Sequence, residues 1–227
     1  MSKKTVLLIY PTIVGEIVNS LAQLASVFKD EGYTVHAQIN TFKKQLTNGD
    51  FLEKAREIGP DIVAISTLTF EMLNTYKLIK MFKDEGYMVI VGGPHATNRP
   101  EEVVQAGADI VVRNEGEETV KELCQYWREG SFSRDPEVLK EKWTQRTDKG
   151  LRVPEAVSET SEEGLGSILG ITYFDPVQNK IRSTPPRERI VELEDIPRPD
   201  YDVFDHAIFR NEEGLIRGTH RIYTTRG

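Results

Sequence analysis

The sequence predicts an α/β protein built on a doubly wound parallel sheet of five strands. Short β-branched and apolar runs such as Val6 to Tyr10 are apolar on both faces, as strands covered on two sides must be. Longer segments with apolar residues at helical spacing separate these runs, and several of them end at glycine. Because parallel strands require crossover connections, this alternation predicts helices on both faces of the sheet.

Strand and helix patterns alternate from residue 5 to about residue 129. The expected strands are Thr5–Tyr10, Thr34–Ile39, Asp61–Ser66, Met88–Val91 and Asp109–Val112. The expected helices cover residues 17–28, 50–57, 70–82, 100–105 and 116–128, and Asp50 is expected to cap the second of them. This pattern favours a flavodoxin-like or Rossmann-like sheet with the strand order 2-1-3-4-5.

The phrase Phe-Lys-Asp-Glu-Gly-Tyr occurs twice, at Phe28–Tyr33 and at Phe82–Tyr87. A duplicated unit would produce such a repeat. Two amphipathic helices that each end at glycine before a strand also explain it, and we favour this second interpretation.

Three regions follow from these patterns. Residues 1–130 are expected to form the Rossmann-like domain, and residues 131–221 a charged insertion, a hairpin and a proline-rich linker. Within the second region we expect a helix over 136–146 and hairpin strands over 167–174 and 180–183. Residues 222–227 are strand-like, and we expect them to open a further domain at which this chain has been cut.

Composition excludes several classes of protein. The formal net charge of -7 disfavours general nucleic-acid binding, which depends on neutralising phosphates. No apolar run is long enough to span a bilayer, and the N-terminus lacks a signal-peptide core. The single cysteine, Cys124, rules out an internal disulfide and a multi-cysteine metal site within these residues, which favours a reducing cytoplasm.

Candidate site residues lie where the expected strands end, because open parallel sheets bind ligands at the carboxyl ends of their strands. Gly92 and Gly93 either allow a ligand to approach the backbone or form a tight exit from the fourth strand. Hydroxyl-bearing residues after the third strand either bind a nucleotide or cap the next helix. These residues are Ser66, Thr67 and Thr69.

Acidic and nucleophilic side chains have both functional and structural explanations. Glu115 and Glu117 flank Gly116 at a helix start, where the helix dipole alone favours carboxylates. His95 could be a base or a metal ligand, but it has no partner nearby in the sequence. Cys124 lies on an apolar helix face and is expected in the core.

Two familiar nucleotide-binding motifs are missing from the sequence. It contains no glycine-rich loop followed by Lys and Ser or Thr, and no Gly-x-Gly-x-x-Gly after the first strand. A P-loop NTPase and an ordinary NAD-dependent dehydrogenase are therefore disfavoured.

The loops, taken in order, resemble the cobalamin-binding domain that precedes the catalytic barrel in class B radical S-adenosylmethionine enzymes. The matching motifs are Ser66-x-Leu68, Gly92-Gly-Pro-His-Ala-Thr97, Pro100-Glu-Glu102 and Asn114-Glu-Gly-Glu-Glu-Thr119. Residues 170–173, 185–186 and 193–201 resemble the family's linker. Thr224-Thr-Arg-Gly227 resembles the strand that opens the barrel, directly before its three-cysteine motif.

The resemblance implies that a corrin ring lies over the carboxyl edge of the sheet and that its nucleotide tail enters between strands. Ser66 and Leu68 would contact the tail, Gly92 and Gly93 would give it room, and the loop at Gly116 would close one side of the corrin. The candidate cofactor-binding residues are therefore Thr12, Gly15, Ser66, Thr67, Leu68, Thr69, Gly92, Gly93, Pro94, His95, Glu115, Gly116 and Glu117.

One departure from related domains concerns the lower side of the cofactor. Many cobalamin domains carry Asp-x-His-x-x-Gly after the first strand, and the histidine is the lower cobalt ligand. This sequence has Tyr10-x-Thr12-x-x-Gly15 instead. Because a hydroxyl is a poorer donor than imidazole, we expect no histidine below the cobalt, as in many class B enzymes.

The resemblance implies a cobalamin-binding accessory domain of a radical S-adenosylmethionine enzyme with methyl-transfer or ring-modifying chemistry. The whole protein would add a 4Fe-4S cluster and S-adenosylmethionine on its barrel, and the fragment alone would be inactive. The alternative is a non-catalytic binding or interaction module that has lost cobalamin, which the loop at Tyr10 to Thr12 favours. A third hypothesis is a stand-alone enzyme that uses Glu115 or His95.

Overall fold

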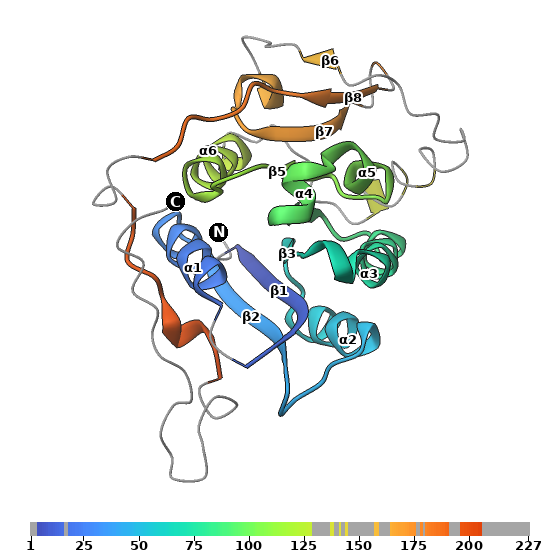
Figure 1. Cartoon of the computed structure of the whole chain (residues 1–227), viewed down its shortest axis with the longest axis vertical. Coiled ribbons are helices and arrows are strands. Elements are labelled where there is room, and N and C mark those ends of the chain that lie inside the picture. Colours follow the sequence, from blue (N-terminus) through green and yellow to red (C-terminus); the bar gives the residue numbers. More distant parts are fainter. Residues whose placement is uncertain are drawn as a thin grey trace.

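The computed structural model describes residues 4–15, 18–128, 164–175, 180–190 and 196–205, together with 137, 138, 141, 144, 157, 158 and 178. These residues form an α/β fold around one sheet (Figure 1), and the predicted fold class is confirmed. Most of the helix expected over 136–146 and all of the strand expected at 222–227 lie outside the described residues.

Five parallel strands form the centre of the sheet in the predicted order β2-β1-β3-β4-β5. They are β1 (Thr5–Val14), β2 (Thr34–Thr41), β3 (Ile62–Ser66), β4 (Val89–Gly92) and β5 (Ile110–Val112). β1 is longer than predicted because its last residues pair again with β2 after an irregularity, at Val14 and Thr41.

The expected hairpin extends this same sheet. Its strands are β7 (Ile171–Asp175) and β8 (Lys180–Ser183), and β7 pairs antiparallel with β5. The short strand β6 (Val157–Ser158) pairs with β8 at the edge. The sequence pattern placed the hairpin in the linker region, whereas its backbone continues the main sheet.

Helices cover both faces of the sheet (Figure 1), and each face has its own apolar core. Helices α1 (Asn19–Asp30) and α6 (Glu117–Arg128) cover one face. The other face is covered by α2 (Asn48–Ile58), α3 (Met72–Asp84), α4 (Pro94–Asn98) and α5 (Pro100–Gln105). Short 3-10 helices span Thr69–Glu71, Gly164–Ser167 and Tyr201–Val203.

Some helix boundaries differ from the prediction. The N-cap of α2 is Thr47, not Asp50: the Asp50 amide donates to Thr47 Oγ1 at 3.3 Å, and the Thr47 amide donates to the Asp50 carboxylate at 2.7 Å. This reciprocal capping box makes Asp50 the third residue of the helix. Helix α4 was not predicted, and α3 begins only after the 3-10 turn at Thr69–Glu71.

The repeated phrase forms the same helix C-terminal turn twice. In each copy the tyrosine amide donates to the phenylalanine carbonyl, at 2.9 Å in the first copy and 3.0 Å in the second. Gly32 and Gly86 adopt φ angles of 87° and 83°, which allow that turn. The phenylalanine and tyrosine rings meet edge to face in both copies. The need for a glycine in the turn that ends each helix, followed by a tyrosine that packs on the phenylalanine, is therefore sufficient to explain the repeat.

No helix in the described part of the chain is long and apolar enough to cross a membrane. Within the same residues, no group of three or more His, Cys, Asp and Glu side chains could hold a metal ion. Cys124 is fully buried, as expected, and burial raises the pKa of its thiol to about 12.

Candidate functional site

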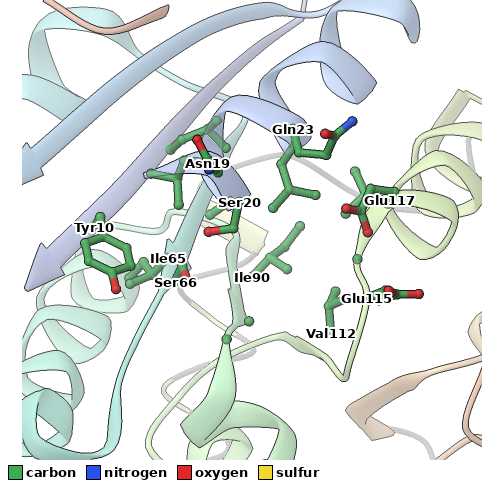
Figure 2. A pocket seen from close by; sticks show the side chains of 18 of the residues that line it. Tyr10, Asn19, Ser20, Gln23, Ile65, Ser66, Ile90, Val112, Glu115 and Glu117 are labelled. Carbon is green, nitrogen blue, oxygen red and sulfur yellow. The ribbon is translucent and has the colours of Figure 1, made fainter. Parts of the chain in front are cut away.

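A cavity of about 970 Å³ lies between the sheet and helices α1 and α6, at the carboxyl ends of the strands (Figure 2). Its walls come from β1, β3, β4 and β5, from α1 and the start of α6, and from residues 196–201. Crevices at the carboxyl edge of such sheets are where ligands bind, because helix starts and loops converge there. The structure thus places an open ligand-sized space at the predicted edge.

The sheet forms one side of the cavity, which we call its floor. This floor is recessed because small residues occupy neighbouring strands. Side chains alternate across a strand, so Ala64 and Ser66 of β3 face the same side, as do Ile90 and Gly92 of β4. Ala64, Ser66 and Gly92 therefore leave a depression on the face that α1 and α6 cover. Figure 2 shows Ser66 and Ile90 on this floor.

The paired glycines have different reasons to be glycine. Gly93 has a φ of 99°, and a Cβ there would lie 2.8 Å from the Thr67 carbonyl oxygen, so the fold itself requires glycine. A Cβ on Gly92 would lie 3.6 Å from the Val112 carbonyl oxygen, an ordinary contact, and the φ of Gly92 is not positive. The protein's own packing therefore leaves room for a Cβ at Gly92, and because Gly92 lacks one, this space stays part of the cavity.

The residues after β3 divide between the cavity and the core. Ser66 and Leu68 line the cavity. Thr67 faces the other way: it is fully buried, and its hydroxyl lies 3.0 Å from the hydroxyl of Thr75 on α3. Thr69 is exposed and does not line the cavity, and the 3-10 helix that it begins has no side-chain cap. The structure therefore brings only Ser66 and Leu68 to the cavity.

The loop after β5 forms one wall of the cavity through Glu115, Gly116 and Glu117. The Glu115 carboxylate accepts a hydrogen bond from the Ile190 amide at 2.8 Å. Glu117 is buried in the first turn of α6, where the helix dipole favours its charge. Asn114 adopts a φ of 61°, and its amide donates to Thr97 Oγ1 at 2.9 Å.

The remaining predicted residues differ in position. Pro94 lines the cavity, but His95 is buried away from it, with its Nε2 atom 3.3 Å from the Tyr76 hydroxyl. Burial lowers the pKa of His95. Thr12 and Gly15 do not line the cavity either. Thr12 is buried within β1 and its hydroxyl has no hydrogen-bond partner, whereas Gly15 is exposed.

Sequence patterns did not identify two contributors to the cavity. One is the first part of α1, where Asn19, Ser20 and Gln23 line the wall (Figure 2). Polar residues on the sheet-facing side of an amphipathic helix were the signal that could have revealed them. The other contributor is the segment 196–205, which we call the strap and which packs along α1.

Hydrogen bonds hold the strap against α1. The Gln23 side-chain amide donates to the Pro197 carbonyl oxygen, and the Asp200 amide donates to the Ala22 carbonyl oxygen at 2.9 Å. Lys29 and Asp200 form an ion pair. Phe204, near the end of the strap, is buried in the core that α1 and α6 share. These contacts fix the strap as a wall of the cavity.

The chemistry of the lining suits binding better than acid–base catalysis. Among the described residues, the lining includes no histidine, cysteine or lysine, and its charged members are Glu115, Glu117 and Arg198. Most of the remaining lining is apolar, with hydroxyl and amide groups near the strand ends. Fold and cavity together define an α/β domain with a ligand-sized cavity at the carboxyl edge of its sheet.

Comparison with known proteins shows what this domain is similar to. Residues 17–124 match the B12 binding domain family. An uncharacterized methyltransferase of Pyrococcus horikoshii is 32% identical over 187 residues, which cover 81% of this chain and 33% of the relative. An anaerobic magnesium-protoporphyrin IX monomethyl ester cyclase of Cereibacter sphaeroides is 26% identical over 160 residues, covering 69% of this chain and 25% of the relative. The chain spans about a third or less of the length of these curated relatives.

Solved structures show the same fold. The cobalamin-dependent S-adenosylmethionine radical enzyme OxsB, with aqua-cobalamin and S-adenosylmethionine bound, matches 88% of this chain and 24% of its own, with a TM-score of 0.62 and 16% identity. The radical S-adenosylmethionine methyltransferase TsrM from Kitasatospora setae, with cobalamin and a 4Fe-4S cluster bound, matches 87% of this chain and 31% of its own, with a TM-score of 0.59 and 17% identity. The match of residues 17–124 to the B12 binding domain family confirms the resemblance to a cobalamin-binding domain found in the sequence, and the two solved structures share its fold.

Proposed function

We propose that this chain is the cobalamin-holding part of a radical S-adenosylmethionine enzyme that performs methyl-transfer or ring-modifying chemistry. The observation that carries the proposal is the depression at Gly92, which the fold leaves open although its own packing would admit a Cβ there. The family match and the bound cobalamin of OxsB and TsrM support cobalamin as the occupant.

The residues present fit the nucleotide tail of cobalamin. The volume of about 970 Å³ lies at the upper end of the range usual for ligand sites. Ser20, Asn19 and Ser66 offer hydroxyl and amide donors for phosphate and ribose oxygens near the strand ends. The apolar floor and helices can receive the base of the nucleotide.

We assign the residues as follows. Ser66, Leu68 and Gly92 would hold the tail, and Gly116 with its two flanking glutamates would close one side of the corrin. Thr67 and His95 would support the end of β3 at Ser66 and the start of α4 at Pro94, because both are buried against α3. The strap would cover the tail along α1.

Cobalamin, when bound, would supply a cobalt centre that carries a methyl group or directs the fate of a radical. A barrel in the whole protein would hold the 4Fe-4S cluster and S-adenosylmethionine. The S-adenosylmethionine bound in OxsB, the 4Fe-4S cluster bound in TsrM and the greater length of the relatives support this assignment of the cluster and S-adenosylmethionine to another domain. On this proposal the present chain alone is catalytically inactive, and its cytoplasmic location stays a prediction.

Hydroxocobalamin provides the direct test of binding. After the purified chain is mixed with excess hydroxocobalamin and passed through a gel-filtration column, we expect the protein peak to carry the visible spectrum of cobalamin at close to one equivalent. The cavity holds the ligand through many apolar contacts, so it should survive the column. A colourless protein peak would contradict the proposal.

The lower side of the bound cobalt should have no protein nitrogen. Neither His36 nor His95, the two histidines within the described residues, lines the cavity, and Thr12 offers only a hydroxyl. Electron paramagnetic resonance of the bound cobalt(II) form should therefore show no splitting that changes when the protein alone is labelled with nitrogen-15. A label-dependent splitting would show that a histidine ligates the cobalt after all.

A further inference from the structure

The ends of β1 and β3 place two hydroxyl-bearing residues side by side on the floor of the cavity. The register of these strands pairs Leu8 with Ala64. Tyr10 and Ser66 follow these residues by two positions, so they lie next to each other on the same face of the sheet. Ser66 in turn pairs with Gly92 of β4, which has no side chain. Figure 2 shows Tyr10 and Ser66 together at one side of the cavity.

Tyr10 is a buried residue whose hydroxyl group has no partner in the described part of the protein. It is 9% exposed, and its ring packs in the core beneath α1 and α6. Its side chain lines the cavity, and no described residue forms a hydrogen bond with its hydroxyl. Because most buried side-chain polar atoms in folded proteins have a partner, this hydroxyl is left available to a ligand.

The hydroxyl of Tyr10 acts as a hydrogen-bond donor at neutral pH. Burial raises the pKa of Tyr10, so the phenol keeps its proton. Ser66 adds a second hydroxyl that can donate at the same end of the floor. A ligand group with several acceptor oxygens would satisfy both residues.

The start of α1 favours negative charge at this end of the cavity. The helix begins five residues after β1 ends, and Asn19 and Ser20 of its first turn line the cavity. Among the described residues, no side chain caps α1 and its first turn holds no acidic residue, so its positive dipole end is not neutralised there. In Figure 2, Glu115 and Glu117 lie on the opposite side of the cavity from Tyr10. A group that is anionic and rich in acceptor oxygens therefore fits here.

The cation of the described lining lies at a different place. Arg198 belongs to the strap, and its carbonyl oxygen accepts a hydrogen bond from Ser26, about two turns along α1 from the start of the helix. Arg198 is also exposed, whereas Tyr10 is buried. The two residues thus give competing positions for an anion in this cavity.

We propose that Tyr10, Ser66 and the start of α1 form a phosphate site, in which the Tyr10 hydroxyl donates a hydrogen bond to the phosphate group of a corrinoid. This inference rests on the proposed function, because it assumes that the nucleotide tail of the corrinoid occupies the cavity. It makes Tyr10 a residue that selects corrinoids carrying a phosphate over those without one.

Three corrinoids test the phosphate site by equilibrium dialysis. They are hydroxocobalamin, cobinamide phosphate, which lacks the ribose and base, and cobinamide, which also lacks the phosphate. Tyr10→Phe removes only the hydroxyl, so we expect it to weaken the binding of cobalamin and cobinamide phosphate by at least about tenfold. This is the usual effect of losing a hydrogen bond to a charged group. The affinity for cobinamide should stay unchanged, and Ser66→Ala should show the same selective loss.

Tyr87→Phe is the matched control for loss of a tyrosine hydroxyl. Tyr87 packs on the opposite face of the sheet, where its ring meets Phe82 edge to face, and it does not line the cavity. This substitution should leave all three affinities unchanged. Circular dichroism of each variant checks that the fold is retained.

The outcomes separate the phosphate site from the proposed function. If Tyr10→Phe left the affinity for cobinamide phosphate unchanged, or weakened all three corrinoids equally, the phosphate site would be wrong and the proposed function would stand. The same would follow if Arg198→Gln, and not Tyr10→Phe, selectively weakened the two corrinoids that carry a phosphate. If the unaltered chain bound none of the three corrinoids, the proposed function and the phosphate site would both be wrong.

Discussion

Replacing Gly92 with valine is expected to weaken cobalamin binding by at least about tenfold while the protein stays folded. The added side chain would fill the depression between Ala64, Ser66 and Ile90. A nucleotide tail can lie on this floor only if that depression is empty. Valine is a favourable strand residue, and its Cβ meets only an ordinary contact at 3.6 Å. Titration with hydroxocobalamin, followed by visible absorption, measures the loss.

A control separates a filled cavity from a general effect of losing glycine. Gly49 is exposed in α2, has no positive φ and lies outside the cavity lining, so Gly49→Val should leave cobalamin affinity unchanged. Gly93→Val is unsuitable for this purpose, because a side chain there would collide with the Thr67 backbone and disturb the fold. If Gly92→Val bound cobalamin as tightly as the unaltered chain, the floor would not be the site of the tail.

Replacing Lys83 with methionine is expected to lower the free energy of unfolding by about 3–5 kcal/mol, the usual cost of breaking a buried ion pair. The Lys83 side chain is only 2% exposed and lies 2.7 Å from the Asp109 carboxylate. Its ammonium also donates to the Tyr87 carbonyl oxygen, and Asp109 accepts from the Val89 amide. The pair therefore joins α3 to the starts of β4 and β5, and its loss leaves the half-buried Asp109 carboxylate without its cation.

Urea unfolding of matched variants measures this effect. Lys80→Met removes an exposed ion pair with Asp84 from the same helix, so it should cost no more than about 0.5 kcal/mol. The double variant Lys83→Met with Asp109→Leu should lose less stability than the sum of the two single changes. Each single change leaves the other charged group without its ion-pair partner, whereas the double variant removes both charges. A loss below about 1 kcal/mol in Lys83→Met would show that the pair is not structurally important.

The strand order could be predicted from sequence because it depends on local and general rules. Apolar runs marked each central strand, and the crossover rule then left few ways to order them. The junction of the hairpin with β5 could not be predicted in this way. It depends on a pairing between segments about sixty residues apart, and no pattern in either segment specifies that partner.

The site was predicted in part for similar reasons. The order of loops located Ser66, Gly92 and Gly116 at one edge of the sheet, where the structure finds the cavity. Strand alternation could have shown that Thr67 faces away from Ser66. The different roles of Gly92 and Gly93 depend on backbone angles and on the neighbouring carbonyl oxygens, which sequence alone does not contain.

The contribution of α1 and the strap required the tertiary structure. Asn19 and Ser20 begin an ordinary amphipathic helix, and the prolines of the strap indicate only an extended segment. The strap becomes a wall of the cavity only through the hydrogen bonds of Pro197 and Asp200 to α1, which lies more than 170 residues away along the chain.

The central claim is that the nucleotide tail of cobalamin lies on the floor formed by β3 and β4, beneath α1 and α6. A crystal structure of this chain grown with hydroxocobalamin tests it most directly. The predicted result is electron density for the tail in contact with Ser66 and Gly92, with the corrin ring at the carboxyl edge of the sheet. Cobalamin bound elsewhere on the molecule, with this cavity left without ligand density, would contradict the claim.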